Sequence, residues 1–256
     1  EDSACALGVA AACPALFQFM ATFSESASTA LQLIISMDAE LLTIVGRSLA
    51  VSATACALAC SLGLVLGAWL GVGRFAGRGA VLTLLNTFLA VPSVVVGLVV
   101  YLLLSRAGPL GTLGILFTPT AMVIAQSILV VPLVAALARR LVLLALAEGG
   151  DQLRSLGAGR FTTAVLLLLH ERFGVLTVLL TAFGRAIAEV GAVMIVGGNI
   201  DGVTRVMTTT IALETSKGDL PLALALGIVL LAVVALLNAV IATLQWRSGA
   251  PREALA

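Results

Sequence analysis

Long stretches of this chain contain no charged residue, and short polar segments separate them. The uncharged stretches cover residues 48–73, 79–105, 107–138, 173–184 and 220–246. A helix needs about 20 apolar residues to cross roughly 30 Å of hydrocarbon. The stretch that begins at Phe173 reaches that length only by continuing through Arg185 and Glu189 to Gly198. The pattern predicts five membrane-spanning helices, at about residues 41–72, 80–105, 118–140, 173–198 and 220–246.

Composition supports the same fold class. Hydrophobic residues make up 61% of the chain, charged residues make up 11%, and the mean hydropathy is +1.17. A soluble domain of this size would need more charge to cover its surface. We expect an all-α polytopic membrane protein that is embedded in the lipid bilayer. The net charge of +1 carries no information about nucleic acid, but the chain has no basic run, and we expect no nucleic-acid partner.

The basic residues orient these spans. With the polar segment after the third span in the cytoplasm, one group of arginines falls inside: Arg74, Arg78, Arg139, Arg140, Arg154, Arg160, Arg172, Arg247 and Arg252. A smaller group then falls outside: Arg47, Arg106, Arg205 and Lys217. Cytoplasmic loops carry an excess of Lys and Arg, so this distribution predicts a cytoplasmic C-terminus.

The main polar interruption of the core is the segment 148–160, which is rich in charge and glycine. It reads Glu-Gly-Gly-Asp-Gln-Leu-Arg-Ser-Leu-Gly-Ala-Gly-Arg. We expect it to face water and to contact a partner. Tight turns are expected at its glycines, since glycine adopts backbone conformations that other residues avoid; these are Gly149, Gly150, Gly157 and Gly159.

Several residues inside the predicted spans are unusual for hydrocarbon. Pro92, Pro119 and Pro132 remove backbone donors and favour kinks, and Ser93 and Gly97 after Pro92 allow a bend and a close helix approach. Such kinks suit either a pathway or ordinary packing.

Two charged residues inside the fourth span are equally unusual. Arg185 and Glu189 are four residues apart, so they are expected to pair on one helix face. An ion pair in a span normally faces the bundle interior or a wet cavity. The pair is either a structural link between helices or a substrate contact.

The segment 197–210 follows the fourth span and is rich in glycine and hydroxyl groups. With Asn199 and Arg205, it is expected to line an entrance for an anion, although a plain solvated loop fits the same composition.

The first 36 residues fit this scheme poorly. Residues 4–23 are apolar enough for a sixth, N-terminal span, but no basic segment precedes them as in a signal peptide. Residues 1–36 are therefore treated as an extension, 37–248 as the membrane domain and 249–256 as a cytoplasmic tail.

Cys56 and Cys60 are expected to be small buried thiols, and no metal site or catalytic residue is predicted.

The polar insert resembles the cytoplasmic loop of permease subunits of ATP-binding-cassette (ABC) importers. In that family an acidic residue and two alanines precede a glycine, and a hydrophobic pair and a proline follow. Here Asp151 and Gly157 match, as do Leu167 and Leu169, whereas Gln152 and Leu153 replace the alanines and His170 replaces the proline.

A longer match involves residues 184–200 together with Thr204, Arg205 and 213–220. It resembles the signature of the molybdate, sulfate and tungstate permeases, and is closest in form to the tungstate branch. The resemblance covers roughly residues 37–248.

This resemblance implies a homodimer in the bacterial or archaeal cytoplasmic membrane, importing a tetrahedral oxyanion such as tungstate. It implies two ABC subunits that bind ATP and Mg²⁺, and an extracytoplasmic binding protein. The permease itself would bind no cofactor and perform no bond chemistry. The coupling loop would span about 147–172, with these residues at the ATPase: Asp151, Arg154, Leu156, Gly157, Ala158 and Arg160. The candidates for the pathway or its gate are Pro92, Arg185, Glu189, Asn199 and Arg205.

Two other classes of protein compete with this interpretation. An intramembrane enzyme would need a nucleophile with a base, or metal ligands, whereas the chain has a single His and no Gly-x-Ser-x-Gly. An ion-coupled secondary transporter often has paired repeats. No internal repeat is evident in this sequence. The main support for a secondary transporter is the carboxylate of Glu189 inside the fourth span.

Overall fold

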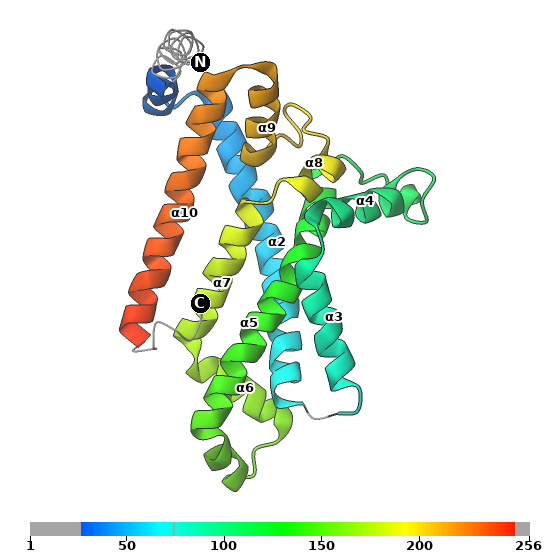
Figure 1. The fold of residues 1–256 in the computed structure, drawn as a ribbon, viewed down its shortest axis with the longest axis vertical. Coiled ribbons are helices and arrows are strands. Elements are labelled where there is room, and N and C mark those ends of the chain that lie inside the picture. Colours follow the sequence, from blue (N-terminus) through cyan, green and yellow to red (C-terminus); the bar gives the residue numbers. More distant parts are fainter. Residues whose placement is uncertain (1–26, 74, 249–256) are drawn as a thin grey trace, which may run out of the picture.

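The computed structural model describes residues 27–73 and 75–248, and this part of the chain is helical without strands (Figure 1). A helix over residues 27–35 comes first. The main helices follow in this order: α2 (Ala39–Val72), α3 (Arg78–Ala90), α4 (Ser93–Leu104), α5 (Pro119–Ser155), α6 (Arg160–His170), α7 (Arg172–Ile187), α8 (Gly191–Gly197), α9 (Met207–Lys217) and α10 (Leu220–Ser248), with a 3-10 turn η1 (Gly111–Leu113) before α5. The predicted sixth span over 4–23 and the tail 249–256 lie outside the described residues.

Three helices are long and apolar enough to cross a membrane: α2, α5 and α10. They confirm the predicted spans near 41–72, 118–140 and 220–246. The Asp38 carboxylate begins α2 by accepting hydrogen bonds from the backbone N–H groups of Glu40 and Leu41 at 3.0 and 3.1 Å. α5 continues well beyond its predicted end, with Pro132 inside it and Pro119 as its first residue.

The other two predicted spans are not straight helices. In the predicted span 80–105, α3 and α4 bend by 98° at a short break. α6, which precedes the predicted span 173–198, meets α7 at an angle of 79°. Pro92 stands at the first break, where its fixed φ and missing N–H end one helix and permit the next. The expected span 173–198 is also interrupted, because α7 ends at Ile187 and α8 begins at Gly191.

A stripe of glycines joins α2 to α5. Gly63, Gly67 and Gly71 recur every four residues, so they share one face of α2. A Cβ on Gly67 would lie 2.4 Å from the Ala135 carbonyl oxygen, and one on Gly63 would lie 2.6 Å from Val134 Cβ. Small residues let membrane helices approach closely and gain van der Waals contact. This contact forms the centre of the bundle.

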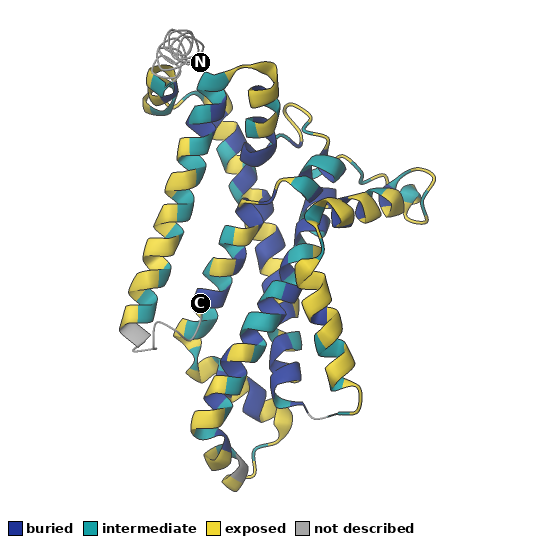
Figure 2. Cartoon of the chain, viewed as in Figure 1, coloured by how far each residue is buried: buried dark blue, intermediate teal, exposed yellow. Residues whose placement is uncertain are grey.

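The shorter helices lie toward the two ends of the molecule (Figure 1). The turn from α2 to α3, the end of α5 and α6 lie at one end, whereas α4, α8 and α9 lie toward the other (Figure 1). α10 is exposed along much of its length (Figure 2), including Leu231 and Leu236 at 70% and 66%. Lipid would cover such a surface. The chain is thus a helical, multi-pass membrane protein.

Candidate functional site

The polar insert folds as a helical hairpin, which we call the insert hairpin (residues 147–170). Its first arm is the end of α5 and its second arm is α6. Between the arms, Gly157 adopts φ +75° and Ala158 N–H donates to the Leu153 carbonyl at 3.0 Å, a hydrogen-bonded helix end that favours glycine. Gly159 precedes α6 in extended backbone. Gly149 and Gly150 lie inside α5, so the turns predicted there were wrong: unbroken helix already satisfies their backbone groups.

One face of the insert hairpin is packed and its tip is open. Ala164 and Leu167 of α6 bury against Ala68, Val142 and Ala145, and Leu153 packs against the same cluster. At the tip, Leu156 and Phe161 are each 81% exposed. The predicted contact residues Asp151, Gly157 and Arg160 are also exposed, and Ala158 is half-buried. Arg154 lies in α5, but its side chain is outside the described part.

Sequence reasoning did not single out Phe161. A large aromatic side chain directly after the charged insert was the available signal. The tip thus combines apolar and charged groups, which suits a protein contact.

A second polar site lies at the break between α7 and α8. Arg185 Nη1 donates to Glu189 Oε2 at 2.6 Å, which confirms the predicted pair. Glu189 is 4% exposed, and its Oε1 accepts the Ala192 N–H at 3.3 Å at the start of α8. The Ser93 hydroxyl at the start of α4 lies beside this carboxylate.

The Glu189 carboxylate therefore links the end of α7 to the start of α8, beside the start of α4. Because α7 ends at Ile187, Glu189 belongs to the break and not to a continuous helix face as predicted. Its backbone carbonyl accepts from Thr208 Oγ1 of α9 at 2.8 Å, which adds a fourth helix.

α4 and α8 approach each other closely beside this break, as predicted for the segment after Pro92. A Cβ on Gly97 would lie 2.7 Å from Ala192 Cα, and one on Gly191 would lie 2.8 Å from Ser93 Oγ. The buried Gln126 of α5 donates to the Ala186 carbonyl at 3.0 Å and holds the end of α7.

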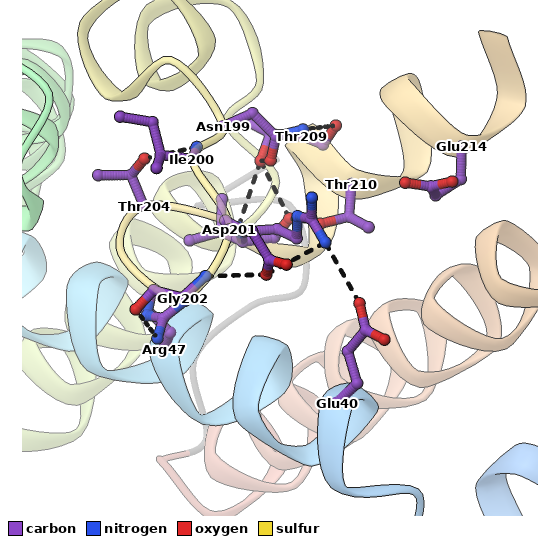
Figure 3. A network of polar contacts seen from close by, with 12 residues as sticks. Glu40, Arg47, Asn199, Ile200, Asp201, Gly202, Thr204, Thr209, Thr210 and Glu214 are labelled. Atoms are coloured by element: carbon purple, nitrogen blue, oxygen red, sulfur yellow. Dashed lines mark hydrogen bonds and ion pairs between the residues drawn. The ribbon is translucent and has the colours of Figure 1, made fainter. Parts of the chain in front are cut away.

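A third polar site joins the loop before α9 to the start of α2 (Figure 3). Arg205 Nη1 lies 3.2 Å from both Glu40 and Asp201 carboxylate oxygens. Arg205 is 14% exposed, so it is held in the loop and does not extend freely into solvent. Arg47 Nη2 donates to the Gly202 carbonyl at 2.8 Å and makes a second link from α2 to the same loop.

Asn199 stabilises the conformation of this loop. It adopts φ +49° and accepts from Thr209 Oγ1 at 2.9 Å, which fastens the loop to α9. Thr204 closes the turn by accepting the Ile200 N–H at 2.9 Å and donating to the Gly197 carbonyl.

The structure thus divides the predicted pathway residues into two sites. Arg185 and Glu189 pair at the α4–α7–α8 junction, where Pro92 precedes α4, while Asn199 and Arg205 belong to the loop site. Glu40 and Thr208 were missed because only the fold brings them to their partners. Cys56 and Cys60 are free and buried, as predicted.

Comparison with known proteins points to one family. The chain is 44% identical to the tungstate uptake system permease protein TupB of Peptoclostridium acidaminophilum over 230 residues, covering 88% of this chain and 99% of that protein. It is 42% identical to a probable anion ABC transporter permease protein of Haloferax volcanii over 204 residues, covering 78% and 88%. It is 41% identical to TupB of Campylobacter jejuni over 160 residues, covering 60% and 65%.

No family model matches the chain. The first two relatives nevertheless align with nearly their whole length, and the described helices fit a multi-pass permease. The chain belongs to the family of ABC transporter permeases that includes the tungstate uptake permeases.

Proposed function

We propose that this chain is the membrane-spanning permease of an ATP-driven importer for a tetrahedral oxyanion, with tungstate as the first candidate. Two copies would enclose the pathway, two separate ABC subunits would hydrolyse ATP, and an external binding protein would deliver the anion. The names of the relatives support the transport class and the anion.

The observation that carries the proposal is the insert hairpin. Its packed face fixes it to α2 and α5, while Leu156 and Phe161 stand open at its tip. Because α5 is one helix from Pro119 to Ser155, a force on the tip is transmitted directly into the bundle. ATP binding that draws two ATPases together would then shift the permease between its two openings, provided the ATPases bind those states with different affinity.

The α4–α7–α8 junction is the proposed gate. A dry, uncharged passage would strongly oppose a dianion. Arg185 is about half exposed at 46%, and Glu189 holds its guanidinium in place. Breaks at Pro92 and at residues 188–190 allow helix ends, rather than whole spans, to move during opening.

The coupling part of the proposal is tested by changing the tip. We expect Leu156→Ala with Phe161→Ala to abolish binding-protein-stimulated ATP hydrolysis by the assembled transporter, because both side chains would seat in the ATPase. Leu169→Ala is the matched control, since Leu169 is 67% exposed at the far end of α6. Full stimulation in the double variant would refute the assigned contact.

The substrate part is tested in proteoliposomes that contain permease, ATPase and binding protein. We expect tungstate to accumulate only with internal ATP, and to outcompete molybdate and sulfate. Uptake that persists without ATP and collapses with the proton gradient would instead identify a secondary transporter.

A further inference from the structure

Two cavities open side by side at the end of the molecule that carries the insert hairpin. The first has a volume of about 480 Å³ and lies between the end of α2, the start of α3, α5 and α6, with Arg78, Arg160 and Thr163 in its wall. The second has a volume of about 430 Å³ and lies between α2 and α6. Val72, Gly73 and Arg160 line both cavities, so the two are contiguous.

The first cavity is basic. Neither Asp nor Glu occurs among the described residues that line it. Arg78 is half-buried, and its Nε and Nη2 donate to the Leu70 carbonyl at 3.1 and 3.0 Å, which fixes the guanidinium beside the end of α2. Arg160 enters from the other side on α6, and the Thr163 hydroxyl lies one turn further along.

The second cavity is apolar and aromatic. Trp69 and Phe75 stack with ring centroids 4.5 Å apart, and Val165 and Leu168 continue the wall. Phe161 lies at the edge of this cavity with 81% of the residue exposed, so it remains open to a protein contact. Trp69 is 51% exposed near the end of a membrane-spanning helix. Tryptophan is enriched at that depth, where the headgroups meet the hydrocarbon.

We propose that these two cavities together bind one anionic phospholipid from the leaflet on the side of the insert hairpin. The phosphate would lie between Arg78 and Arg160, and an acyl chain would fill the apolar cavity. A free oxyanion would occupy only the basic cavity, so the contiguous apolar one favours a lipid. The inference does not depend on which anion is transported.

A neighbouring cavity shows that the basic lining is not a general property of this end of the molecule. It has a similar volume of about 410 Å³ at the same end, but Glu148 and Glu171 line it. Those carboxylates would repel a phosphate, whereas the basic cavity matches its charge.

The test is native mass spectrometry of the assembled transporter, incubated with phosphatidylglycerol or phosphatidylethanolamine of identical acyl chains. We expect the unmodified protein to prefer phosphatidylglycerol. The preference should fall about fivefold in Arg160→Gln and about thirtyfold when Arg78→Gln is added, given the usual contribution of one basic residue near a membrane surface. Equal retention of both lipids, or an unchanged preference in the double variant, would overturn the proposal.

Two controls separate local binding from general effects. Arg140→Gln removes an exposed arginine of α5 that lines neither cavity, and should leave the preference unchanged. Arg160→Lys keeps the charge and should keep most of the preference. Because Arg160 is exposed, its variants should unfold at the temperature of the unmodified protein, so Arg160→Gln remains informative even if the Arg78 variant misfolds.

A further variant distinguishes a lipid from a free anion. Val165→Trp fills the apolar cavity and should lower phosphatidylglycerol binding without affecting the binding of inorganic phosphate. If this variant retains the lipid fully, and inorganic phosphate displaces it from the unmodified protein, the site binds a free anion and the lipid assignment is wrong.

Discussion

The carboxylate of Glu189 is bonded to groups of the protein itself and is not free to bind a ligand. It accepts from Arg185 and from the Ala192 N–H while only 4% of the residue is exposed. A buried carboxylate held in this way repels an anionic substrate and instead fixes the helix ends around it. The geometry therefore favours the structural link over direct contact with the substrate, the two roles that the sequence left open.

At the same scale, we predict that Glu189→Gln lowers anion uptake while the transporter still assembles. The amide keeps the shape of the side chain but leaves Arg185 without its counter-charge and presents an N–H₂ group to donors. We expect a loss of about 1–3 kcal/mol in the free energy of unfolding, as for a buried group left without its partner. Thermal unfolding and uptake measure the two effects.

The control for this substitution is the double variant Arg185→Gln with Glu189→Gln. Removing both charges should restore part of the lost stability, because no unpaired ion remains. Uptake and assembly that both stay normal in Glu189→Gln would remove Glu189 from the mechanism.

Arg205 gives a second prediction at the residue scale. Arg205→Glu would place a third carboxylate beside Glu40 and Asp201, and should open the loop before α9. We expect impaired uptake with normal attachment of the ATPase, measured by transport and by co-purification. Adding Glu40→Arg should recover part of the uptake, since the charges can pair again, whereas normal uptake in Arg205→Glu alone would contradict the assignment.

At the scale of elements, the close contact of α4 with α8 depends on the absence of a side chain at Gly97. The Ala192 backbone occupies the space where a Cβ would lie, at 2.7 Å from Ala192 Cα. Backbone cannot move aside as a flexible side chain can, so the two helices would have to separate.

We therefore predict that Gly97→Ala lowers the free energy of unfolding by about 1–3 kcal/mol, the usual cost of overpacking. Gly46→Ala is the matched control, because a Cβ there meets nothing within 4 Å. In a helix interior that exchange should be neutral or stabilising by about 0.4–1 kcal/mol. Equal thermal unfolding of the two variants would show that α4 and α8 do not pack as described.

At the scale of the whole molecule, the ends carry different chemistry. The insert hairpin lies at one end, and the loop site, between the start of α2 and the loop before α9, lies toward the other (Figure 1). The excess of arginine at the hairpin end predicts that this end faces the cytoplasm.

Sidedness is tested by labelling single cysteines in a cysteine-free background with a membrane-impermeant maleimide. Leu156→Cys and Val203→Cys suit this test, since the native side chains are 81% and 45% exposed. We expect intact cells to label only Val203→Cys, and permeabilised cells to label both. Labelling of Leu156→Cys in intact cells would reverse the predicted orientation.

The sequence predicted the membrane class, the spans of α2, α5 and α10, and the Arg185–Glu189 pair. It did so because these features depend on local pattern: uncharged length for a span, and a spacing of four residues for a pair. The motifs at 148–160 and 184–200 also indicated the permease family, which the relatives confirm.

Tertiary structure decided the remaining features. Pro92 marked in the sequence where the second span could bend, but apolar composition is the same for a straight span and a bent one. The angle of 98° and the break at 188–190 therefore depended on which helix ends could pack together. The partners of Glu189 and Arg205 likewise lie on separate elements, and residue spacing carries no information about such distant contacts. Hydrophobic length alone determined that this chain enters a membrane, whereas the packing of helix ends decided where its polar groups meet.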